Sequence, residues 1–224
     1  MATTDRPAPH LDARLLTAAH LVRPGSVAAD VGCDHGRLAA WLACTGRCPR
    51  VMAGDLRPAP LATARETCRA FACEDRVDCR LAAGLEGLEP GQVQDIVVAG
   101  LSAETMIEVF EAAPWVFAPG MRLVLVPATR HEVLRRWLAR RGFALAADIP
   151  VQCAGRWYAV IAADYTGKGR EPEEAWCQLG DTGLYPGGEG YKADRLIRWR
   201  KRLRGMPDEE ERARQLAMIE QLEG

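Results

Sequence analysis

Residue types that could support chemistry gather in the stretch VAADVGCDHG near the start of the chain. Asp30 and Asp34 stand on either side of Gly32, and His35 follows directly. A glycine is favoured where the backbone must approach a ligand closely, and a carboxylate beside it can bind a cationic or hydroxyl group. Asp34 has a structural alternative as the N-cap of the helix that follows. His35 could hydrogen-bond a ligand, or it could be a structural imidazole.

A second acid, Asp55, ends the apolar segment VMAGD, at the next place where a strand is expected to end. In nucleotide-binding α/β sheets an acid about 20 residues beyond the glycine turn accepts hydrogen bonds from the ribose hydroxyls. Asp55 alone does not decide which adenosine cofactor is bound, because dinucleotides use the same contact. The chain lacks the G-x-G-x-x-G fingerprint of dinucleotide-binding proteins.

The elements that must position these residues alternate between strand and helix. Runs such as IVVA and LVLV suit strands that are buried on both faces, and strand–helix alternation predicts a parallel sheet. The spacing predicts strands at 26–31, 51–55, 77–82, 95–100 and 121–127, and helices at 11–22, 37–44, 60–71, 102–112 and 130–141.

The pattern changes after residue 142. The segments FALAADIPVQ and RWYAVIAAD, joined by a turn at Ala154–Gly155, predict an antiparallel hairpin that closes the parallel sheet. Five parallel strands plus such a hairpin are typical of class I S-adenosylmethionine-dependent methyltransferases and uncommon in dinucleotide dehydrogenases. We therefore predict an α/β fold with a Rossmann-like class I methyltransferase sheet and a small C-terminal helical appendage.

The chain divides into three parts by composition. Residues 1–165 form the predicted S-adenosylmethionine-binding methyltransferase domain, 166–190 an irregular connecting segment rich in glycine, proline and acids, and 191–224 a C-terminal helical hairpin. Asp208 is the expected N-cap of the second of these two helices.

Composition narrows the class of protein further. The 224 residues are 48% hydrophobic with a net charge of −1, and they contain no apolar run of about 18 residues, so we expect no membrane span. The start of the chain lacks a secretory signal pattern. The eight cysteines show no C-x2-C spacing. We expect reduced thiols in a cytoplasmic protein, and no metal.

The first C-terminal helix carries two stripes. Helical spacing places Arg195, Arg198 and Arg202 near one stripe, which could neutralise RNA phosphates. Leu196, Trp199 and Leu203 form the other. The alternative is a solvated face with arginine–glutamate pairs, whose apolar stripe packs on the next helix. Both can hold at once.

Longer segments resemble a known family. The sequences RLLTAAHLVRPGSVAADVGCDHGRLAAWL, GDLRPAPLATA, RLAAGL, DIVVAGL, LVLVPATRHEVLRRWLARRGFALAAD and RWYAVIAA are similar to the bacterial tRNA (adenine(22)-N1)-methyltransferases of the TrmK type. The resemblance covers roughly residues 11–165, and its most specific element is D-x-G-x-D-H. It implies S-adenosylmethionine as the cofactor, tRNA as the partner and N1 of an adenosine as the methyl acceptor.

The resemblance also implies roles for particular residues. Asp34 lies beside the reaction centre in the family, where a carboxylate would stabilise the positive charge that develops on the methylated adenine. Candidate catalytic residues are Asp34 and His35; candidate cofactor-binding residues are Asp30, Gly32, Cys33, Asp55, Leu56, Ala83, Gly84, Ala99 and Gly100; candidate RNA-binding residues are Arg37, Arg195, Arg198 and Arg202.

Three places depart from the family pattern. Ala83 stands where the family usually has an acid. Ser102–Ala103 replace the last two residues of the family's G-M-G-G segment, and Ala128 replaces the last residue of its Q-P-N segment. Two alternatives therefore stay open. One is a methyltransferase of altered RNA specificity, and the other is a degenerate RNA-binding module that keeps the cofactor fold without turnover.

Overall fold

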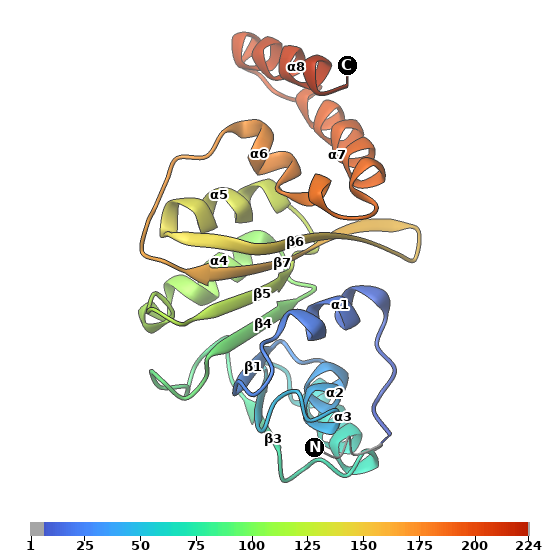
Figure 1. Ribbon diagram of the computed structural model, residues 1–224, viewed down its shortest axis with the longest axis vertical. Coiled ribbons are helices and arrows are strands. Elements are labelled where there is room, and N and C mark those ends of the chain that lie inside the picture. The colour runs from blue at the N-terminus through green and yellow to red at the C-terminus, as the bar shows by residue number, and fades with distance from the viewer. Residues whose placement is uncertain (1–6, 224) are drawn as a thin grey trace.

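One seven-stranded sheet organises the computed structural model, which describes residues 7–223 (Figure 1). The strand order is β3-β2-β1-β4-β5-β7-β6. The strands are β1 (Ala28–Val31), β2 (Val51–Asp55), β3 (Val77–Leu81), β4 (Asp95–Ala99), β5 (Arg122–Val126), β6 (Phe143–Cys153) and β7 (Arg156–Tyr165). Neighbouring strands from β3 to β5 pair in parallel, and β7 runs antiparallel to both β5 and β6. The predicted parallel sheet with a terminal hairpin is confirmed.

Helices cover both faces of the sheet. α1, α2 and α3 pack on one face, and α4 and α5 pack on the other (Figure 1). The helices are α1 (Ala13–Leu21), α2 (Arg37–Cys44), α3 (Pro58–Ala70), α4 (Ala103–Glu111), α5 (His131–Arg141), α6 (Glu174–Leu179), α7 (Gly188–Leu203) and α8 (Glu209–Glu223), with short 3-10 turns η1 (Pro114–Val116) and η2 (Thr182–Leu184). Among residues 7–223, none of the helices has the length and apolar content that a bilayer crossing requires.

The central strands explain the continuous apolar runs in the sequence. Every residue of β1 is buried, and so are the first four residues of β4, because helices lie on both sides of these strands. β1 lies between β2 and β4. The chain therefore leaves β1 toward one edge of the sheet and returns later to its other side. Sheets of this kind bind ligands at the carboxyl ends of the strands beside such a switch point.

The expectation of an irregular segment over residues 166–190 was wrong in part. This segment contains α6 and η2, and α7 begins at Gly188, three residues earlier than expected. The cause is tertiary: the buried Arg135 guanidinium donates hydrogen bonds to the carbonyl oxygens of Cys177 (3.3 Å) and Gln178 (3.1 Å) at the end of α6. Glycine and proline content does not reveal a long-range contact of this kind.

A buried polar cluster attaches α7 to the sheet. Arg135 of α5 donates to both carboxylate oxygens of Asp148 on β6 (2.8 and 2.9 Å) and to the Tyr191 hydroxyl on α7 (3.1 Å). The Tyr191 hydroxyl also lies 2.7 Å from Nδ1 of His131. All four side chains are buried, and burial lowers the pKa of His131, which keeps its ring neutral. We call these four residues the anchor cluster.

The two C-terminal helices pack against each other beyond the β6 edge of the sheet (Figure 1). Leu196, Trp199 and Leu203 of α7 are buried against Ile219 of α8, so the predicted apolar stripe is confirmed. The indole N–H of Trp199 donates to the Gln215 side chain at 2.8 Å, which satisfies the only polar atom of this large buried side chain.

Candidate functional site

The loop after β1 is held in an unusual backbone conformation. Gly32, Asp34 and Gly36 all have positive φ angles of 71°, 48° and 67°. Gly36 also permits close packing, because a Cβ atom there would lie 2.8 Å from the Cβ of Ala64 on α3. For Asp34 the left-handed conformation is uncommon in a residue with a side chain, and such residues are found at functional sites more often than elsewhere.

A cleft of about 340 Å³ opens beside this loop, at the carboxyl ends of β1 and β4. It brings together eight of the predicted site residues, five residues that were not predicted and no residue from the C-terminal helices. The predicted members are Asp30, Gly32, Cys33, Asp34, His35, Arg37, Ala99 and Gly100, and the others are Arg14, Leu15, Leu38, Arg57 and Leu101.

Asp30 forms the polar floor of the cleft. Its side chain is buried, and Oδ2 has no hydrogen-bond partner among the described residues. Burial raises the pKa of Asp30 to about 7, against the opposing effect of the Ala39 backbone N–H, and the negative charges of Asp55 and Asp34 raise it further. A buried carboxylate oxygen without a partner costs free energy unless a ligand supplies a donor. The floor therefore suits a cationic group.

Asp55 organises the loop from the end of β2. Its Oδ2 accepts a hydrogen bond from the backbone N–H of Asp34 (3.1 Å), and its Oδ1 accepts one from the backbone N–H of Arg57 (2.9 Å). A carboxylate offers about four acceptor positions, so Asp55 keeps capacity for further donors. It is buried and is absent from the cleft lining, while its neighbour Leu56 is exposed.

Asp34 and His35 lie at the mouth of the cleft with more than half of each side chain exposed. Nε2 of His35 lies 3.6 Å from Oδ2 of Asp34, and a guanidinium nitrogen of Arg57 lies 3.9 Å from Oδ1. The N-cap of α2 is Gly36, with no side-chain capping bond. The capping role that the sequence allowed for Asp34 is absent, so its carboxylate is free to face a ligand.

The remaining predicted cofactor residues lie one loop away. Ala83 and Gly84, after β3, line a neighbouring cleft of about 430 Å³. The Gly84 carbonyl oxygen would lie 3.8 Å from a Cβ atom on Gly54, so this loop comes close to the end of β2. The carboxylate of Glu86 accepts a hydrogen bond from the Ala83 backbone N–H at 3.4 Å.

The residues that depart from the family pattern have structural roles here. The Ser102 hydroxyl caps α4 by accepting from the Thr105 backbone N–H (3.2 Å). Ser102 and Thr129 form a parallel bridge that extends the pairing of β4 and β5, and the Ala128 N–H donates to the Leu101 carbonyl oxygen at 2.8 Å. The Ser102 hydroxyl and the backbone of Ser102, Ala128 and Thr129 therefore stabilise the turns at these strand ends.

The C-terminal arginines do not form one exposed stripe. Arg195 is buried and donates to Glu132 on α5 at 2.9 Å. Arg202 pairs with the other oxygen of Glu132, while Arg198 pairs with Asp194 on its own helix at 2.7 Å and stays half exposed. Burial and pairing argue against a phosphate contact by Arg195.

Sequence reasoning missed Arg14 and Arg57, which line the cleft. Arg57 had a signal, since it follows Asp55 by two positions. Arg14 had none, because nothing in the sequence of α1 shows that this helix reaches the switch point. All eight cysteines are free thiols. Within residues 7–223 there is no group of three or more His, Cys, Asp or Glu side chains that could hold a metal ion.

The strand order defines a Rossmann-like α/β protein. The cleft at the switch point, beside the loop after β1, is its candidate ligand site. A family model described as "Methyltransferase domain" matches residues 11–161. The chain therefore belongs to the methyltransferase-domain family.

Individual relatives agree with this assignment. The tRNA (adenine(22)-N(1))-methyltransferase of Bacillus subtilis is 26% identical over 154 residues, which are 69% of this chain and 65% of that protein. The crystal structure of B. subtilis TrmK has a TM-score of 0.78 at 21% identity and covers 95% of each chain. A Streptococcus pneumoniae protein described as a tRNA (m1A22) methyltransferase, solved with S-adenosyl-L-methionine, has a TM-score of 0.82 at 23% identity and covers 95% of this chain and 99% of its own. The predicted TrmK-type resemblance is confirmed in sequence and fold.

Proposed function

We propose that the protein transfers a methyl group from S-adenosylmethionine to N1 of an adenosine in tRNA, in the cytoplasm. The observation that carries this proposal is the contrast between two aspartates of one loop. Asp30 is buried at the floor of the cleft with an unpartnered oxygen, and Asp34 is exposed at its mouth. One carboxylate suits a bound cofactor and the other suits a substrate that enters from solvent.

Residues of the cleft, together with Asp55 behind its loop, fit S-adenosylmethionine. Asp30 would accept a hydrogen bond from the amino group of the methionine moiety, because its Oδ2 lacks a partner. Asp55 would receive the ribose hydroxyls through acceptor positions that the Asp34 and Arg57 amides leave open. Gly32 and Gly100 let the backbone approach the ligand closely.

When bound, S-adenosylmethionine supplies an electrophilic methyl group. Adenine N1 carries a lone pair, so the protein needs no strong base to activate it. The methylated base is cationic, and the Asp34 carboxylate would stabilise that charge near the exocyclic amine. Arg57, 3.9 Å from Asp34, and His35, 3.6 Å from it, lie beside the carboxylate at the cleft mouth. His35 could also hydrogen-bond the target base.

Basic side chains at the cleft would meet the phosphates of the tRNA. Arg14, Arg37 and Arg57 come from α1, α2 and the turn before α3, and all three line the cleft. Arg198 on α7 adds a half-exposed guanidinium farther along the chain. Such contacts neutralise phosphate charge without reading base identity.

The direct test is incubation with unmodified bulk tRNA and labelled S-adenosylmethionine, followed by nucleoside analysis. The proposal expects labelled N1-methyladenosine in tRNA. Label in a different nucleoside would support altered specificity. Binding of S-adenosylhomocysteine without any transfer would support the non-catalytic module.

One observation favours the non-catalytic alternative. At the end of β4 the cleft is lined by Ala99, Gly100 and Leu101, and among the described residues its lining includes none from the end of β5. The hydroxyl of Ser102 is engaged in capping α4. No polar side chain from these strand ends lines the cleft. The presence of Asp30, Asp34 and Asp55 favours the catalytic alternative.

A further inference from the structure

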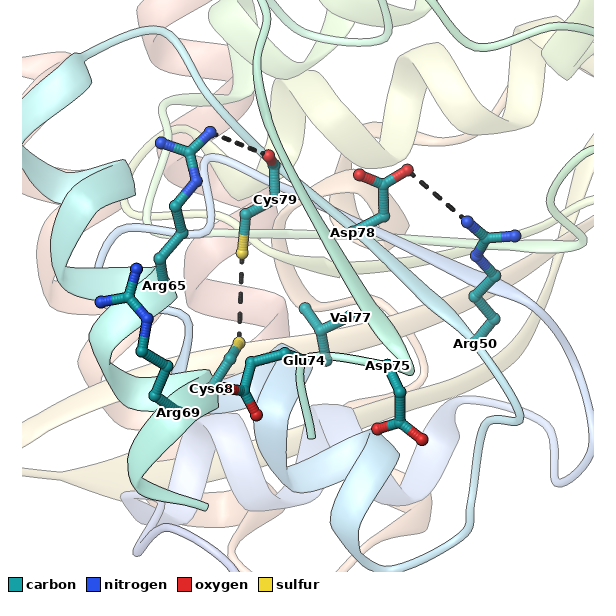
Figure 2. A pocket seen from close by; sticks show the side chains of 9 residues that line it. All are labelled: Arg50, Arg65, Cys68, Arg69, Glu74, Asp75, Val77, Asp78 and Cys79. Atoms are coloured by element: carbon teal, nitrogen blue, oxygen red, sulfur yellow. Dashed lines mark hydrogen bonds and ion pairs between the residues drawn. The ribbon is translucent and has the colours of Figure 1, made fainter. Parts of the chain in front are cut away.

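A second cleft, of about 470 Å³, lies between α3 and β3, away from the candidate site (Figure 2). Two sulfur atoms are in contact in its lining: Sγ of Cys68 on α3 and Sγ of Cys79 on β3 lie 4.0 Å apart. Cys79 is partly exposed, and both residues line the open cleft. Cys68 itself is buried, so a soluble oxidant reaches the pair through Cys79.

The two thiols differ in reactivity. Hydrogen bonding with Cys68 lowers the pKa of Cys79, and the positive charge of Arg65 lowers it further against the effect of burial. The same hydrogen bond, together with burial, raises the pKa of Cys68. Arg65 is held at this place, since its guanidinium donates to the Cys79 carbonyl oxygen at 3.2 Å. Low pKa and exposure are the properties of a thiol that oxidises first.

We propose that Cys68 and Cys79 are an oxidisable dithiol that forms a disulfide when the protein meets a hydroperoxide. In the first step the Cys79 sulfur attacks the peroxide, an S–O bond forms, the O–O bond breaks and an alcohol or water leaves with the thiol proton. In the second step the Cys68 sulfur attacks the sulfenic sulfur, an S–S bond forms, the S–O bond breaks and water leaves. A thiol reductant reverses the reaction.

The disulfide would act on the proposed cofactor edge. Sulfur atoms 4.0 Å apart must approach to about 2.05 Å, so α3 and β3 are drawn together. β3 ends at Leu81, the register partner of Asp55, and the next residue, Ala82, donates its N–H to the Asp55 carbonyl oxygen at 3.1 Å. We expect the oxidised protein to bind S-adenosylhomocysteine several-fold more weakly. This consequence rests on the proposed function, while the disulfide itself does not.

Tryptic mapping tests the disulfide, because each candidate cysteine falls on its own peptide. Cleavage after arginine leaves Cys68 in ETCR, Cys73 in AFACEDR and Cys79 in VDCR. The reduced protein is treated with hydrogen peroxide, alkylated and digested without reductant. We expect ETCR linked to VDCR. Linkage of ETCR to AFACEDR, or no linkage, would overturn the proposal, since Cys73 is the nearby buried competitor whose thiol donates to the Cys68 carbonyl oxygen at 3.6 Å.

Two variants and one condition act as controls. In Cys79→Ser, Cys68 should stay unlinked at the same peroxide dose. Cys153→Ser is the matched control, because Cys153 is also partly exposed but lies at the end of β6; the linkage should persist in it. In urea the fold no longer holds the pair together, so the preference for VDCR over AFACEDR should disappear. Chain proximity alone favours AFACEDR, because Cys73 is nearer to Cys68 in sequence than Cys79 is. A preference for VDCR that survives in urea would show that the fold does not select the pair and would overturn the proposal.

The binding consequence is measured separately by calorimetry with S-adenosylhomocysteine before oxidation, after oxidation and after dithiothreitol. Weaker binding that dithiothreitol restores supports the coupling. Equal affinity of the oxidised and reduced forms overturns the coupling and leaves the mapped disulfide standing. Absence of binding to the reduced protein would count against the proposed function alone.

Discussion

The anchor cluster and the loop after β1 both bury charge, but they treat it in opposite ways. In the anchor cluster the Asp148 carboxylate accepts from Arg135 twice and from the backbone N–H of Asp181 (3.1 Å). In the loop, Asp30 is buried and its Oδ2 has no hydrogen-bond partner in the described part of the chain, and Asp34 has a left-handed backbone conformation. A buried charged group that stabilises the fold needs a hydrogen-bond partner at each of its polar atoms. A buried group that lacks a partner persists where a ligand supplies it.

We therefore expect substitutions in the two regions to change different measured quantities. A substitution in the anchor cluster should lower the free energy of unfolding. A substitution in the loop should change ligand binding or turnover while the protein stays folded.

The largest effect is expected in the anchor cluster. Asp148→Ala leaves the fully buried Arg135 guanidinium without its ion-pair partner, which should cost about 3–5 kcal/mol of unfolding free energy. Urea unfolding measures the loss. Glu171→Ala is the matched control, because it removes an arginine partner at the surface and should leave the urea midpoint nearly unchanged.

Replacing Arg135 by Met and Asp148 by Leu together should recover much of the stability. A small loss for Asp148→Ala would mean that this pair does not anchor α7.

The next effect concerns turnover. Asp34→Asn keeps the shape and hydrogen-bonding capacity of the side chain but removes its negative charge. If the carboxylate stabilises a developing cation, the methylation rate should fall on the order of 100-fold or more, as when one preorganised electrostatic group is lost. Single-turnover kinetics with tRNA measure the rate. The urea midpoint should stay unchanged, because the Asp34 side chain makes no capping bond. The affinity for S-adenosylhomocysteine should not fall, because the Asp34 charge raises the pKa of Asp30 and its loss favours the ionised Asp30 carboxylate. Near wild-type turnover would remove Asp34 from the chemistry.

Asp30 gives a smaller effect that depends on pH. Its pKa is raised to about 7 by burial, so the folded carboxyl stays protonated while that of the unfolded chain ionises. Folding stability should therefore fall as pH rises from about 4 to 7 and then level off. Asp30→Asn should remove this decline.

The ionised form of Asp30 is the one that binds an ammonium group, so affinity for S-adenosylhomocysteine should rise about tenfold from pH 6 to pH 8. Calorimetry at both pH values, with Asp30→Asn as the flat control, checks the sign. An affinity that falls over this range would exclude a cationic partner for Asp30.

Much of this architecture follows from sequence patterns. Strand–helix alternation and the run of apolar residues in β4 and β5 predict the sheet because those strands are buried on both faces. The loop after β1 is predictable because its glycines and acids are local signals. Asp34 and Asp55 were placed at one edge of the sheet, and the hydrogen bond between them confirms that placement.

Other features depend on contacts between distant residues and leave no local pattern. α6 lies in a segment whose composition suggests a loop, and it is held by Arg135, more than 40 positions earlier. The cysteine pair across α3 and β3 has no recognisable motif spacing. Helical spacing placed Arg195 and Arg198 on one stripe, but it could not show that Glu132 of α5 lies beside only one of them.

The smallest effect separates those two arginines. Arg198 is half exposed and, within residues 7–223, pairs with Asp194 alone, an exposed contact on its own helix that contributes little free energy. Its guanidinium can therefore exchange this partner for a phosphate. Arg198→Ala should reduce the slope of log affinity for tRNA against log salt by about one unit, with an unchanged urea midpoint.

Arg195→Ala should behave in the opposite way. Its Nη2 donates to the buried Glu132, although its Nε has no partner among the described residues. Removing it leaves Glu132 with fewer donors, so the free energy of unfolding should fall by about 1–3 kcal/mol. The salt slope of tRNA binding should stay the same, because a buried guanidinium releases no counterion from RNA. Filter binding at several salt concentrations, paired with urea unfolding of both variants, gives the answer. If Arg195→Ala flattened the slope and left stability intact, α7 would have to present Arg195 to RNA in a different arrangement. Arg195 would then be an RNA-binding residue and not one that attaches α7 to α5.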